Sequence, residues 1–332
     1  MYIILYKKMY ENLIRAPDMT LDIVYTYVNT TDLKWINKVK KYKPTYGDNL
    51  NIKRFNYFGE IIFSLKTVEK YFSWVNNIYI VHDDQEFDIS FLTQKIRNKI
   101  KFIDHKEIIP NQYLPVFNSM LIEMFISEIP NLTDFFIYLN DDVFFGNYVT
   151  HDFFFDNNGI FKHFLVDMKK EYNSNRLINE PHLIRLTNVH NLTKKLFKQD
   201  FYYKSLHASW NLNKYAMKIT FKLFNNFFLK MLETQRFRLY NEDTYEFLLL
   251  SSIMAEHLKI ARKFNIFKKI FILHDKLDVP KYNYIIKSRP SIFVINNLDV
   301  LQLKVWNLLQ QNYLKKDDDS KYNNIKNNIL LK

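Results

Sequence analysis

Strand and helix patterns alternate along about the first 140 residues of this chain. Short apolar runs, typical of strands buried inside a sheet, occur at 21–28, 77–84, 100–105 and 134–141. Helical patterns separate these runs, at 59–72, 91–99 and 117–129. Such alternation predicts parallel strands joined by crossover helices. We therefore expect an α/β fold with a mostly parallel, Rossmann-like sheet, flanking helices and a helical insertion.

The second half of the chain gives weaker patterns. Residues 147–206 indicate loops and short elements that cover a cleft. Beyond them we predict helices and strands in this order: helices at 211–232 and 241–263, strands at 266–275 and 291–297, and a helix from Asp299 to Leu314. The prediction is a single domain over 21–314. Its parts are an α/β core at 21–150 and 264–314, a loop and helical portion at 151–263, an N-terminal extension at 1–20 and a disordered polar tail at 315–332.

Composition narrows the class of protein. The chain has no cysteine, which excludes disulfides, thiolate metal sites and a cysteine nucleophile. Its 47 basic and 35 acidic residues give a net charge of +12, which favours anionic partners such as nucleotides, phosphopolymers or a membrane face. An AT-rich genome would equally explain the many lysines and asparagines, and we expect no nucleic-acid partner. No apolar run is long enough for a membrane span or a signal-peptide core, so we expect a cytoplasmic protein whose charge allows peripheral contact with the inner face of the membrane.

Polar side chains follow three of the predicted strands. In the run FFIYLNDDVFFG at 135–146, the first strand is followed by Asn140, Asp141 and Asp142. Two other strands are followed by Asn29 with Asp32 and by Asp83 with Asp84. In open α/β sheets, ligands bind just beyond the carboxyl ends of the strands. The sequence therefore predicts a site at this edge, in which Asp141 and Asp142 could hold a divalent cation. The alternative for the aspartates is a solvated turn or a helix cap.

Other candidates are ordinary when taken alone. Glu123 fits a solvent-facing position on a helix, and His207, Arg236 and Arg238 fit structural or surface roles. Asn118 and Ser119 fit a helix cap as well as a phosphate site. The chain contains no Walker A, GxGxxG, HExxH or GxSxG sequence. Local chemistry thus indicates an α/β enzyme that uses a nucleotide sugar or a phosphate.

Several sequence blocks resemble one known family. DIVYTYVNTTDLKW, GEIIFSLKTVEKYFSWVNNIYIVHDDQ, IIPNQYLPVFNSMLIE and FIYLNDDVFFG occur in that order between residues 22 and 146. They resemble the Stealth family, which includes bacterial capsular polysaccharide phosphotransferases and animal N-acetylglucosamine-1-phosphotransferase. Weaker resemblance continues through 186–197, 207–238 and 291–299. The chain departs from the family pattern at Tyr57, Phe58, Ser209 and Asn297.

The resemblance implies transfer of a hexose 1-phosphate from a UDP-sugar to a hydroxyl of a glycan acceptor, with release of UMP, in capsular or cell-surface polysaccharide synthesis. It also allows peripheral contact with a capsule-assembly complex. It implies Mg²⁺ or Mn²⁺ as cofactor. Catalytic roles fall on Glu123, Asp142, His207 and Arg238. Metal ligands fall on Asp141, Asp142 and Asn297, and substrate contacts on Asn29, Asp32, Arg54, Asn118, Ser119 and Asn140. The competing interpretations are a GT-A-like glycosyltransferase that releases UDP and a non-catalytic carbohydrate-binding relative.

Overall fold

The computed structural model describes residues 20–42, 59–170, 183–238, 242–265, 269–273, 277–296, 298 and 302–314. Several predictions fall outside these residues, namely those for 1–19, Arg54, Tyr57, Phe58, Asn297 and 315–332. Within the described ranges, no helix combines the length and the apolar character that a membrane span requires.

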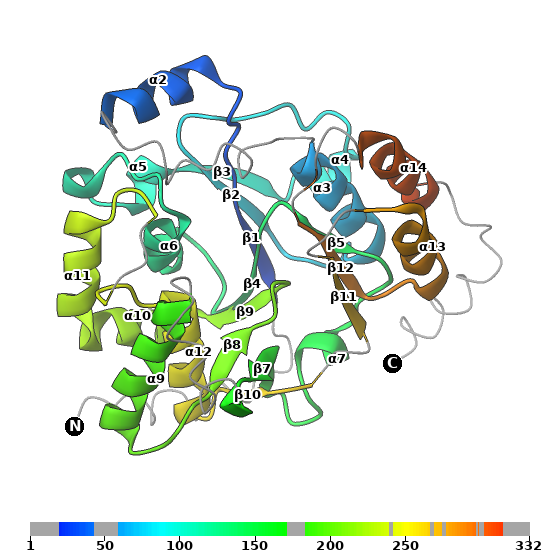
Figure 1. Ribbon diagram of the computed structural model, residues 1–332. Helices are drawn as coiled ribbons and strands as arrows, with labels where there is room; N and C mark the ends of the chain where they lie inside the picture. The colour runs from blue at the N-terminus through cyan, green and yellow to red at the C-terminus, as the bar shows by residue number, and fades with distance from the viewer. Residues whose placement is uncertain are drawn as a thin grey trace.

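The largest sheet has five strands in the order β3-β2-β1-β4-β9 (Figure 1). Their bounds are Ile100–Asp104 (β3), Ile78–His82 (β2), Asp22–Thr26 (β1), Phe135–Leu139 (β4) and Trp210–Asn213 (β9). The first four are parallel, and β9 is antiparallel to β4. Because β1, β2 and β4 are buried along almost their whole length, they appear in the sequence as unbroken apolar runs. The predicted α/β fold with a mostly parallel sheet is confirmed.

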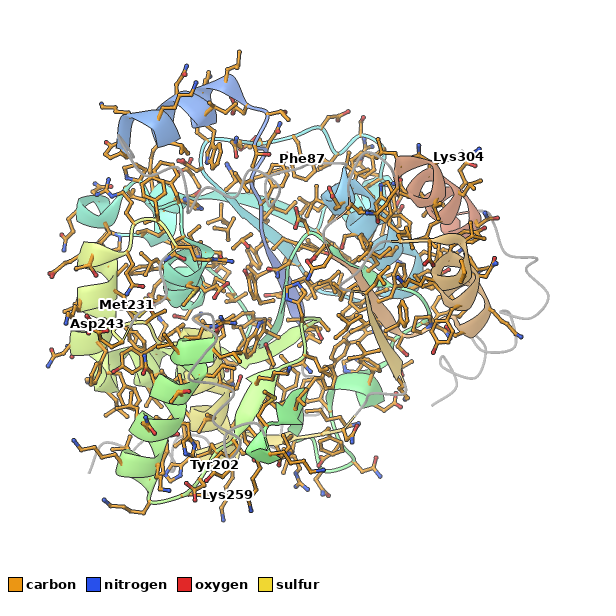
Figure 2. The ribbon with its side chains drawn as sticks, in the orientation of Figure 1. Phe87, Tyr202, Met231, Asp243, Lys259 and Lys304 are labelled. Carbon is orange, nitrogen blue, oxygen red and sulfur yellow. The ribbon has the colours of Figure 1, made fainter. Side chains whose placement is uncertain are left out.

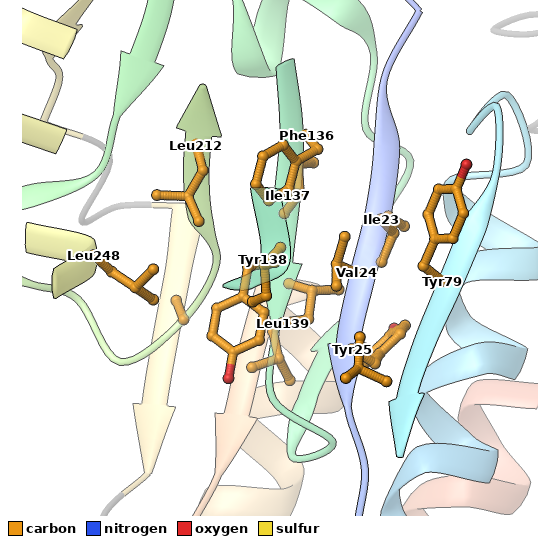
Figure 3. Close-up of a cluster of buried hydrophobic side chains, with 14 of the residues drawn as sticks. Ile23, Val24, Tyr25, Tyr79, Phe136, Ile137, Tyr138, Leu139, Leu212 and Leu248 are labelled. Carbon is orange, nitrogen blue, oxygen red and sulfur yellow. The ribbon is translucent and has the colours of Figure 1, made fainter. Parts of the chain in front are cut away.

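The hydrophobic core is formed by side chains of neighbouring strands of this sheet and of the helices beside it (Figure 3). In register, Tyr25 of β1 faces Ile80 of β2 on one side and Leu139 of β4 on the other. Leu212 of β9 and a helical leucine, Leu248, extend the packed cluster, and these five side chains are each at most 1% exposed. Long polar side chains, such as the exposed Lys259 and Lys304, lie at the periphery (Figure 2).

Strand order fixes the place of a ligand crevice. From β1 the chain runs outward to β2 and β3, and it then returns to form β4 on the other side of β1. Such a reversal is a topological switch point, and the crevice lies outside the carboxyl ends of the two strands that border it. These are the ends of β1 and β4.

A second sheet has the order β11-β12-β5, with bounds Ile270–Leu273, Ile292–Ile295 and Val143–Phe145. β11 is parallel and β5 antiparallel to β12. The chain therefore leaves the main sheet at Leu139 and enters the second sheet at Val143. The other strands that the structure describes form two small sheets. One pairs β10 (Ala261–Lys263) with β6 (Phe161–His163), and the other pairs β7 (Leu165–Asp167) with β8 (Tyr203–Ser205).

Helices flank the main sheet (Figure 1). To its right in the figure lie α3 (Glu60–Tyr71), α4 (Gln94–Arg97), α13 (Val279–Ser288) and α14 (Leu303–Leu314). To its left lie α5 (His105–Ile108), α6 (Ser119–Ile122), α9 (Ile184–Phe197), α10 (Lys214–Leu223), α11 (Asn225–Thr234) and α12 (Phe247–His257). The other helical elements within the described ranges are α2 (Leu33–Tyr42), α7 (His151–Phe154) and the 3₁₀ turns η3 (Asn111–Tyr113) and η4 (Glu123–Glu128).

Two helix predictions were wrong at their starts. The helix expected at 211–232 begins only at Lys214, because Trp210–Asn213 pairs with β4 and the Asn213 side chain then caps α10 by accepting from the backbone N–H groups of Tyr215 and Ala216. Of the residues expected to form a helix at 241–263, the described ones are helical only from Phe247 to His257, and Ala261–Lys263 forms the strand β10.

Two further expectations need correction. The middle segment, expected to hold only loops and short elements, contains the 14-residue helix α9. The helix expected at 117–129 is α-helical only through Ile122 and continues as the 3₁₀ turn η4. Almost every residue of α6 and η4 is buried, so this segment has no solvent-facing stripe of the kind that its apolar spacing suggested.

Gly146 marks a close approach between β5 and the segment before β12. A Cβ atom at this position would lie 2.4 Å from the carbonyl oxygen of Pro290 and 3.0 Å from the Tyr313 hydroxyl. Since the backbone oxygen cannot turn aside, we expect Gly146→Ala to lower the free energy of unfolding by about 1–3 kcal/mol. Urea denaturation measures this loss. The matched control is Gly59→Asn, where φ is +78° and the nearest atom is the Ile62 Cδ1 at 3.8 Å; asparagine tolerates that backbone conformation, so equal losses in both variants would contradict the packing argument.

Candidate active site

The turn that carries Asn140, Asp141 and Asp142 joins the two larger sheets. It follows β4 at the switch point and precedes β5. The backbone N–H of Ile295, at the end of β12, donates to the Asp142 carbonyl at 3.3 Å, and that of Val143 donates to the Asn140 carbonyl at 3.3 Å. The paired carboxylates are thus fixed where strand order predicts a ligand.

Asp142 contacts a histidine that lies 65 residues away along the chain. Its Oδ2 is 3.4 Å from the Nε2 of His207, which sits in the loop between β8 and β9. The Asp142 side chain is 15% exposed and that of His207 is 40% exposed, so a ligand can reach the imidazole. The other carboxylate oxygen of Asp142, Oδ1, is buried without a hydrogen-bond partner among the residues that the structure describes.

Asp141 lies in an acidic environment. Burial raises the pKa of Asp141 to about 8, and the neighbouring charges of Asp142 and Glu60 push it in the same direction. Glu60 is the first residue of α3 and is only 7% exposed. Our sequence reasoning missed Glu60, because one glutamate at the start of an amphipathic helix is an ordinary first-turn residue.

These carboxylates fit a divalent cation. Asp142 Oδ1 is a buried anionic oxygen without a hydrogen-bond donor among the described residues, and a cation offsets the repulsion that Asp141 experiences beside Asp142. Mg²⁺ commonly takes one or two carboxylates and completes its shell with water and substrate phosphates. Over the described ranges no cluster of three or more His, Cys, Asp or Glu side chains is placed to hold a metal. The fit is therefore to a two-carboxylate site that needs substrate oxygens.

His207 has two acceptors around it. Burial lowers the pKa of His207, and the positive charge of Arg238 lowers it further. The hydrogen bond and charge of Asp142, together with a hydrogen bond to Asn296, outweigh both effects and raise that pKa above its ordinary value. Asn296 directly follows β12. The sequence predicted the neighbouring Asn297 as a metal ligand, and that residue lies outside the described residues.

Glu123 is buried, so the solvent-facing alternative is wrong. Glu123 is 8% exposed, and the Tyr138 hydroxyl donates to its Oε1 at 3.1 Å. Burial raises the pKa of Glu123 to about 8, with a further push from Glu246 and an opposing effect from Arg238. Among the described residues no hydrogen bond joins Glu123 to His207; the charge close to both of them is Arg238.

Arg238 is placed by contacts between two short segments. Its guanidinium donates to the Ser119 hydroxyl. Two residues earlier, the Arg236 carbonyl accepts from the Phe117 N–H at 3.0 Å, and the Phe117 ring stacks on that of Phe237 with a centroid distance of 5.0 Å. The segment 236–238 is therefore fastened to the start of α6.

Asn118 contributes to the same junction from inside the protein. It is 0% exposed, its Oδ1 accepts from the Met120 N–H at 3.2 Å, and its Nδ2 donates to the Gln235 carbonyl at 3.0 Å. Both polar atoms of its side chain therefore have protein partners. This arrangement favours a structural cap over the direct substrate contact that the sequence suggested, whereas Ser119 keeps partial exposure beside Arg238.

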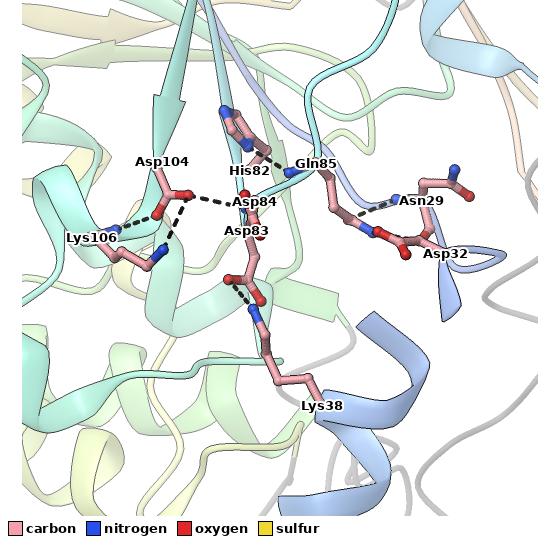
Figure 4. A network of polar contacts seen from close by, with 9 residues as sticks. All are labelled: Asn29, Asp32, Lys38, His82, Asp83, Asp84, Gln85, Asp104 and Lys106. Atoms are coloured by element: carbon pink, nitrogen blue, oxygen red, sulfur yellow. Dashed lines mark hydrogen bonds and ion pairs between the residues drawn. The ribbon is translucent and has the colours of Figure 1, made fainter. Parts of the chain in front are cut away.

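Asn29 and Asp32 belong to a separate polar cluster at the same edge (Figure 4). The Asn29 N–H donates to Gln85 Oε1 at 3.0 Å, and Gln85 Nε2 donates to the Asn29 carbonyl at 2.8 Å and to Asp32 Oδ2 at 3.1 Å. Gln85 thus fixes the loop after β1. No contact joins Asn29 or Asp32 to Asp142 or His207 in the described part of the chain.

The polar ends of β2 and β3 extend that second cluster (Figure 4). Lys38 Nζ lies 2.7 Å from Asp83 Oδ1, and the Asp84 N–H donates to Asp104 Oδ2 at 3.1 Å. Hence the strand ends do meet at one edge, as predicted, but their side chains form two groups. One contains Asp142 and His207; the other fixes loops.

Comparisons with known proteins identify relatives of this chain. The family model described as Stealth protein CR2, conserved region 2, matches residues 54–163, a range that includes Glu60, Glu123, Asp141 and Asp142. The chain is 34% identical over 198 residues to the capsular polysaccharide phosphotransferase cps1A of Actinobacillus pleuropneumoniae, covering 58% of this chain and 50% of that protein. It is 41% identical over 149 residues to the capsular polysaccharide phosphotransferase LcbA of Aeromonas hydrophila, covering 43% of this chain and 40% of that protein.

The chain spans half or less of the length of these two relatives. Among solved structures, the galactosyltransferase LgtC aligns with 91% of this chain and 99% of its own, at a TM-score of 0.42 and 10% identity. The matched region contains three of the four sequence blocks from which the resemblance was drawn, those between residues 59 and 146. Over residues 54–163 the chain is therefore similar to conserved region 2 of the Stealth family.

Proposed function

We propose that this protein transfers a sugar 1-phosphate from a UDP-sugar to a hydroxyl of a glycan acceptor, with UMP as the leaving group. The observation that carries this proposal is the contact between His207 and Asp142 at the switch point, with Arg238 as the nearby cation. Both relatives are named as capsular polysaccharide phosphotransferases, which supports a role in the synthesis of a capsular or cell-surface polysaccharide.

In the proposed reaction, the acceptor oxygen attacks the phosphorus that bears the sugar. A new P–O bond to the acceptor forms, the P–O bond to UMP breaks, and the electron pair of that bond leaves with UMP. His207 takes the proton of the acceptor hydroxyl. The neutral imidazole has one N–H, which one of its neighbours Asp142 and Asn296 accepts, and its other nitrogen takes the proton. Both neighbours then stabilise the imidazolium that this proton transfer creates.

Charge neutralisation is the second requirement, because phosphoryl transfer depends mainly on positioning and on electrostatic stabilisation. The Arg238 guanidinium, oriented by Ser119, offers donors to the phosphate oxygens. Asp141 and Asp142 would hold Mg²⁺ or Mn²⁺, which when bound neutralises donor phosphate charge. Ser119, Asn29, Asp32, Asn140 and Arg54 remain proposed donor contacts.

We expect Arg238→Lys to lower kcat/KM by about 100-fold, because an ammonium cannot reproduce the fork of donors that a guanidinium presents to a phosphate. Steady-state release of UMP measures the loss. The control is Arg236→Lys, two residues before Arg238 in the sequence. The Arg236 guanidinium lies 4.8 Å from the centroid of the Tyr42 ring and has no part in the proposed chemistry. If the two variants are equally active, Arg238 does not serve the transferring phosphate.

The nucleotide product tests the proposed function. The protein is incubated with a panel of UDP-hexoses, Mg²⁺ or Mn²⁺, and oligosaccharide acceptors, and the nucleotide is identified by chromatography. Acceptor-dependent UMP supports the proposal. Acceptor-dependent UDP instead indicates a glycosyltransferase, and tight donor binding without any turnover indicates a carbohydrate-binding protein.

A further inference from the structure

A buried chain of hydroxyl groups leads from the edge of β1 to Glu123, and the proposed steps do not use it. The Tyr138 hydroxyl donates to Glu123 Oε1 at 3.1 Å and lies 2.8 Å from Thr26 Oγ1. A phenol has one hydrogen, which this bond to Glu123 uses, so the Thr26 hydroxyl donates to the Tyr138 oxygen. Thr26 ends β1 and Tyr138 belongs to β4. The chain therefore crosses the two strands that border the switch point.

The hydroxyls of two buried tyrosines of this sheet, Tyr138 and Tyr79, point in opposite directions (Figure 3). Tyr138 is 1% exposed, and its hydroxyl points toward the carboxyl edge of the sheet, whereas the hydroxyl of the equally buried Tyr79 points toward the opposite edge (Figure 3). The Tyr79 hydroxyl has no hydrogen-bond partner among the described residues. Tyr138 thus delivers its hydroxyl to the candidate active site, whereas the Tyr79 hydroxyl points away from it.

Glu123 stands between opposite charges. Glu246 lies close enough to disfavour its carboxylate, while Arg238 and Arg185 favour it. Arg185 also forms an ion pair with Glu246. Ser119, whose hydroxyl receives the Arg238 guanidinium, precedes Glu123 by four residues, so the two residues occupy the same face of this helical turn. With charges of both signs around it, the carboxyl has no single electrostatic anchor, and the neutral hydroxyl of Tyr138 fixes its direction.

We propose that Tyr138 is a positioning residue: its hydroxyl, oriented by Thr26, holds the Glu123 carboxyl beside Arg238 and thereby keeps the guanidinium in the orientation that meets the donor phosphates. This inference rests on the proposed function. It assigns to Glu123 the orientation of Arg238 rather than that of His207, because the charge of Arg238 acts on the Glu123 carboxyl.

Single hydroxyl deletions test the inference. We expect Tyr138→Phe to lower kcat by about 10- to 100-fold, since it removes one hydrogen bond to a buried carboxyl, and to leave the acceptor KM unchanged. The matched control Tyr79→Phe removes a hydroxyl without a partner from the same sheet and should retain full turnover. Thr26→Val should show a smaller loss that vanishes in the Tyr138→Phe background, because the two hydroxyls act as one chain.

A second readout needs no turnover. The carboxyl of Glu123 is followed by carbon-13 NMR, with the signal assigned by its absence in Glu123→Gln. Because the Tyr138 hydroxyl stabilises the charged carboxylate, its removal should raise the titration midpoint of Glu123, whereas Tyr79→Phe should leave it in place. The groups that set this midpoint besides Tyr138 are Glu246, Arg238 and Arg185.

The two readouts separate the inference from the proposed function. If Tyr138→Phe matches Tyr79→Phe in both turnover and Glu123 midpoint, the inference is wrong even though the enzyme releases UMP. If the unaltered protein releases no UMP, the proposed function fails, and the Glu123 midpoint together with the affinity for Mg²⁺ and UDP-sugar then decides whether Tyr138 positions this site. Should Tyr138→Phe not fold, Thr26→Val tests the same chain from its half-buried end.

Discussion

Asp142→Asn is expected to lower the turnover of sugar 1-phosphate transfer by about 1000-fold or more, since it removes an anionic oxygen from the centre of the proposed site. Asp142 has two functions in the account. Its Oδ2 contacts His207, and its buried Oδ1, which has no hydrogen-bond partner in the described part of the chain, is available to a cation. Asparagine keeps the shape and one acceptor oxygen, so the loss reports charge rather than packing.

The same substitution should not weaken the fold. Asp142 contributes to the repulsion that raises the pKa of Asp141, so removing its charge relieves an unfavourable interaction in the folded protein. We expect the Tm of Asp142→Asn to be equal to or higher than that of the unaltered protein, as is common when a functional charge cluster is reduced. Differential scanning calorimetry measures this, and a large drop in Tm would assign Asp142 a structural role.

Asp83→Asn is the matched control. Asp83 follows β2 much as the aspartate pair follows β4. Its Oδ2 is also buried without a hydrogen-bond partner among the described residues. Its other oxygen, however, lies 2.7 Å from Lys38 Nζ, within the cluster that fixes loops. Asp83→Asn should therefore lower stability by removing the partner of Lys38 while it keeps most of the turnover. Similar activity losses in the two variants would mean that the strand edge, and not Asp142, is what matters.

His207→Gln is the second substitution with a large expected effect, a loss of about 100- to 10,000-fold in kcat, which is the range that a general base contributes. Glutamine retains a side chain that can hydrogen-bond to Asp142, but it cannot accept a proton near neutral pH. The assay is acceptor-dependent release of UMP. Donor affinity should change little, because the imidazole acts on the acceptor hydroxyl.

A smaller residue at the same position gives a sharper test of the base. The His207 side chain is 40% exposed, so His207→Ala leaves a space that free imidazole can enter from solvent. Added imidazole should restore part of the activity of His207→Ala and none of that of Asp142→Asn. The control is His190→Gln. His190 Nδ1–H donates to the Phe201 carbonyl at 3.2 Å within the insertion, so its loss should lower stability and leave turnover unchanged. Full activity of His207→Ala without imidazole would refute the assigned role.

The sheet could be predicted from sequence because its main strands are buried on both faces. β1, β2 and β4 appear as apolar runs, and crossover helices make their parallel arrangement and common carboxyl edge predictable. β9 could not be predicted in this way. Its four residues merge with the pattern of the helix that follows, and only pairing with β4 and the cap at Asn213 separate strand from helix.

The site shows a similar division. A turn after β4 was expected to carry Asp141 and Asp142, and the structure has it there. The partners of these residues come from distant segments: His207 lies 65 residues from Asp142, and Arg238 meets Ser119 across 119 residues. Their types and positions were available only through the resemblance, since no local period links them.

Burial hid the remaining site residues. Tyr138 looked like one more apolar member of a strand, although its hydroxyl reaches Glu123. Glu60 looked like a normal first-turn residue of α3. Asn118 looked like a substrate contact, whereas both of its polar side-chain atoms bind the protein. In each case the environment of the polar atom, which a single sequence does not contain, decides what the residue does.

The most direct test of the account follows the phosphorus atom that carries the sugar. A UDP-sugar labelled at its β-phosphorus is incubated with the protein, Mg²⁺ or Mn²⁺, and an oligosaccharide acceptor, and the label is located after separation of nucleotide from glycan. Phosphotransfer carries the label into the glycan as a phosphodiester and leaves unlabelled UMP. Label that stays with the nucleotide as UDP, while the acceptor gains only sugar, would contradict the central claim.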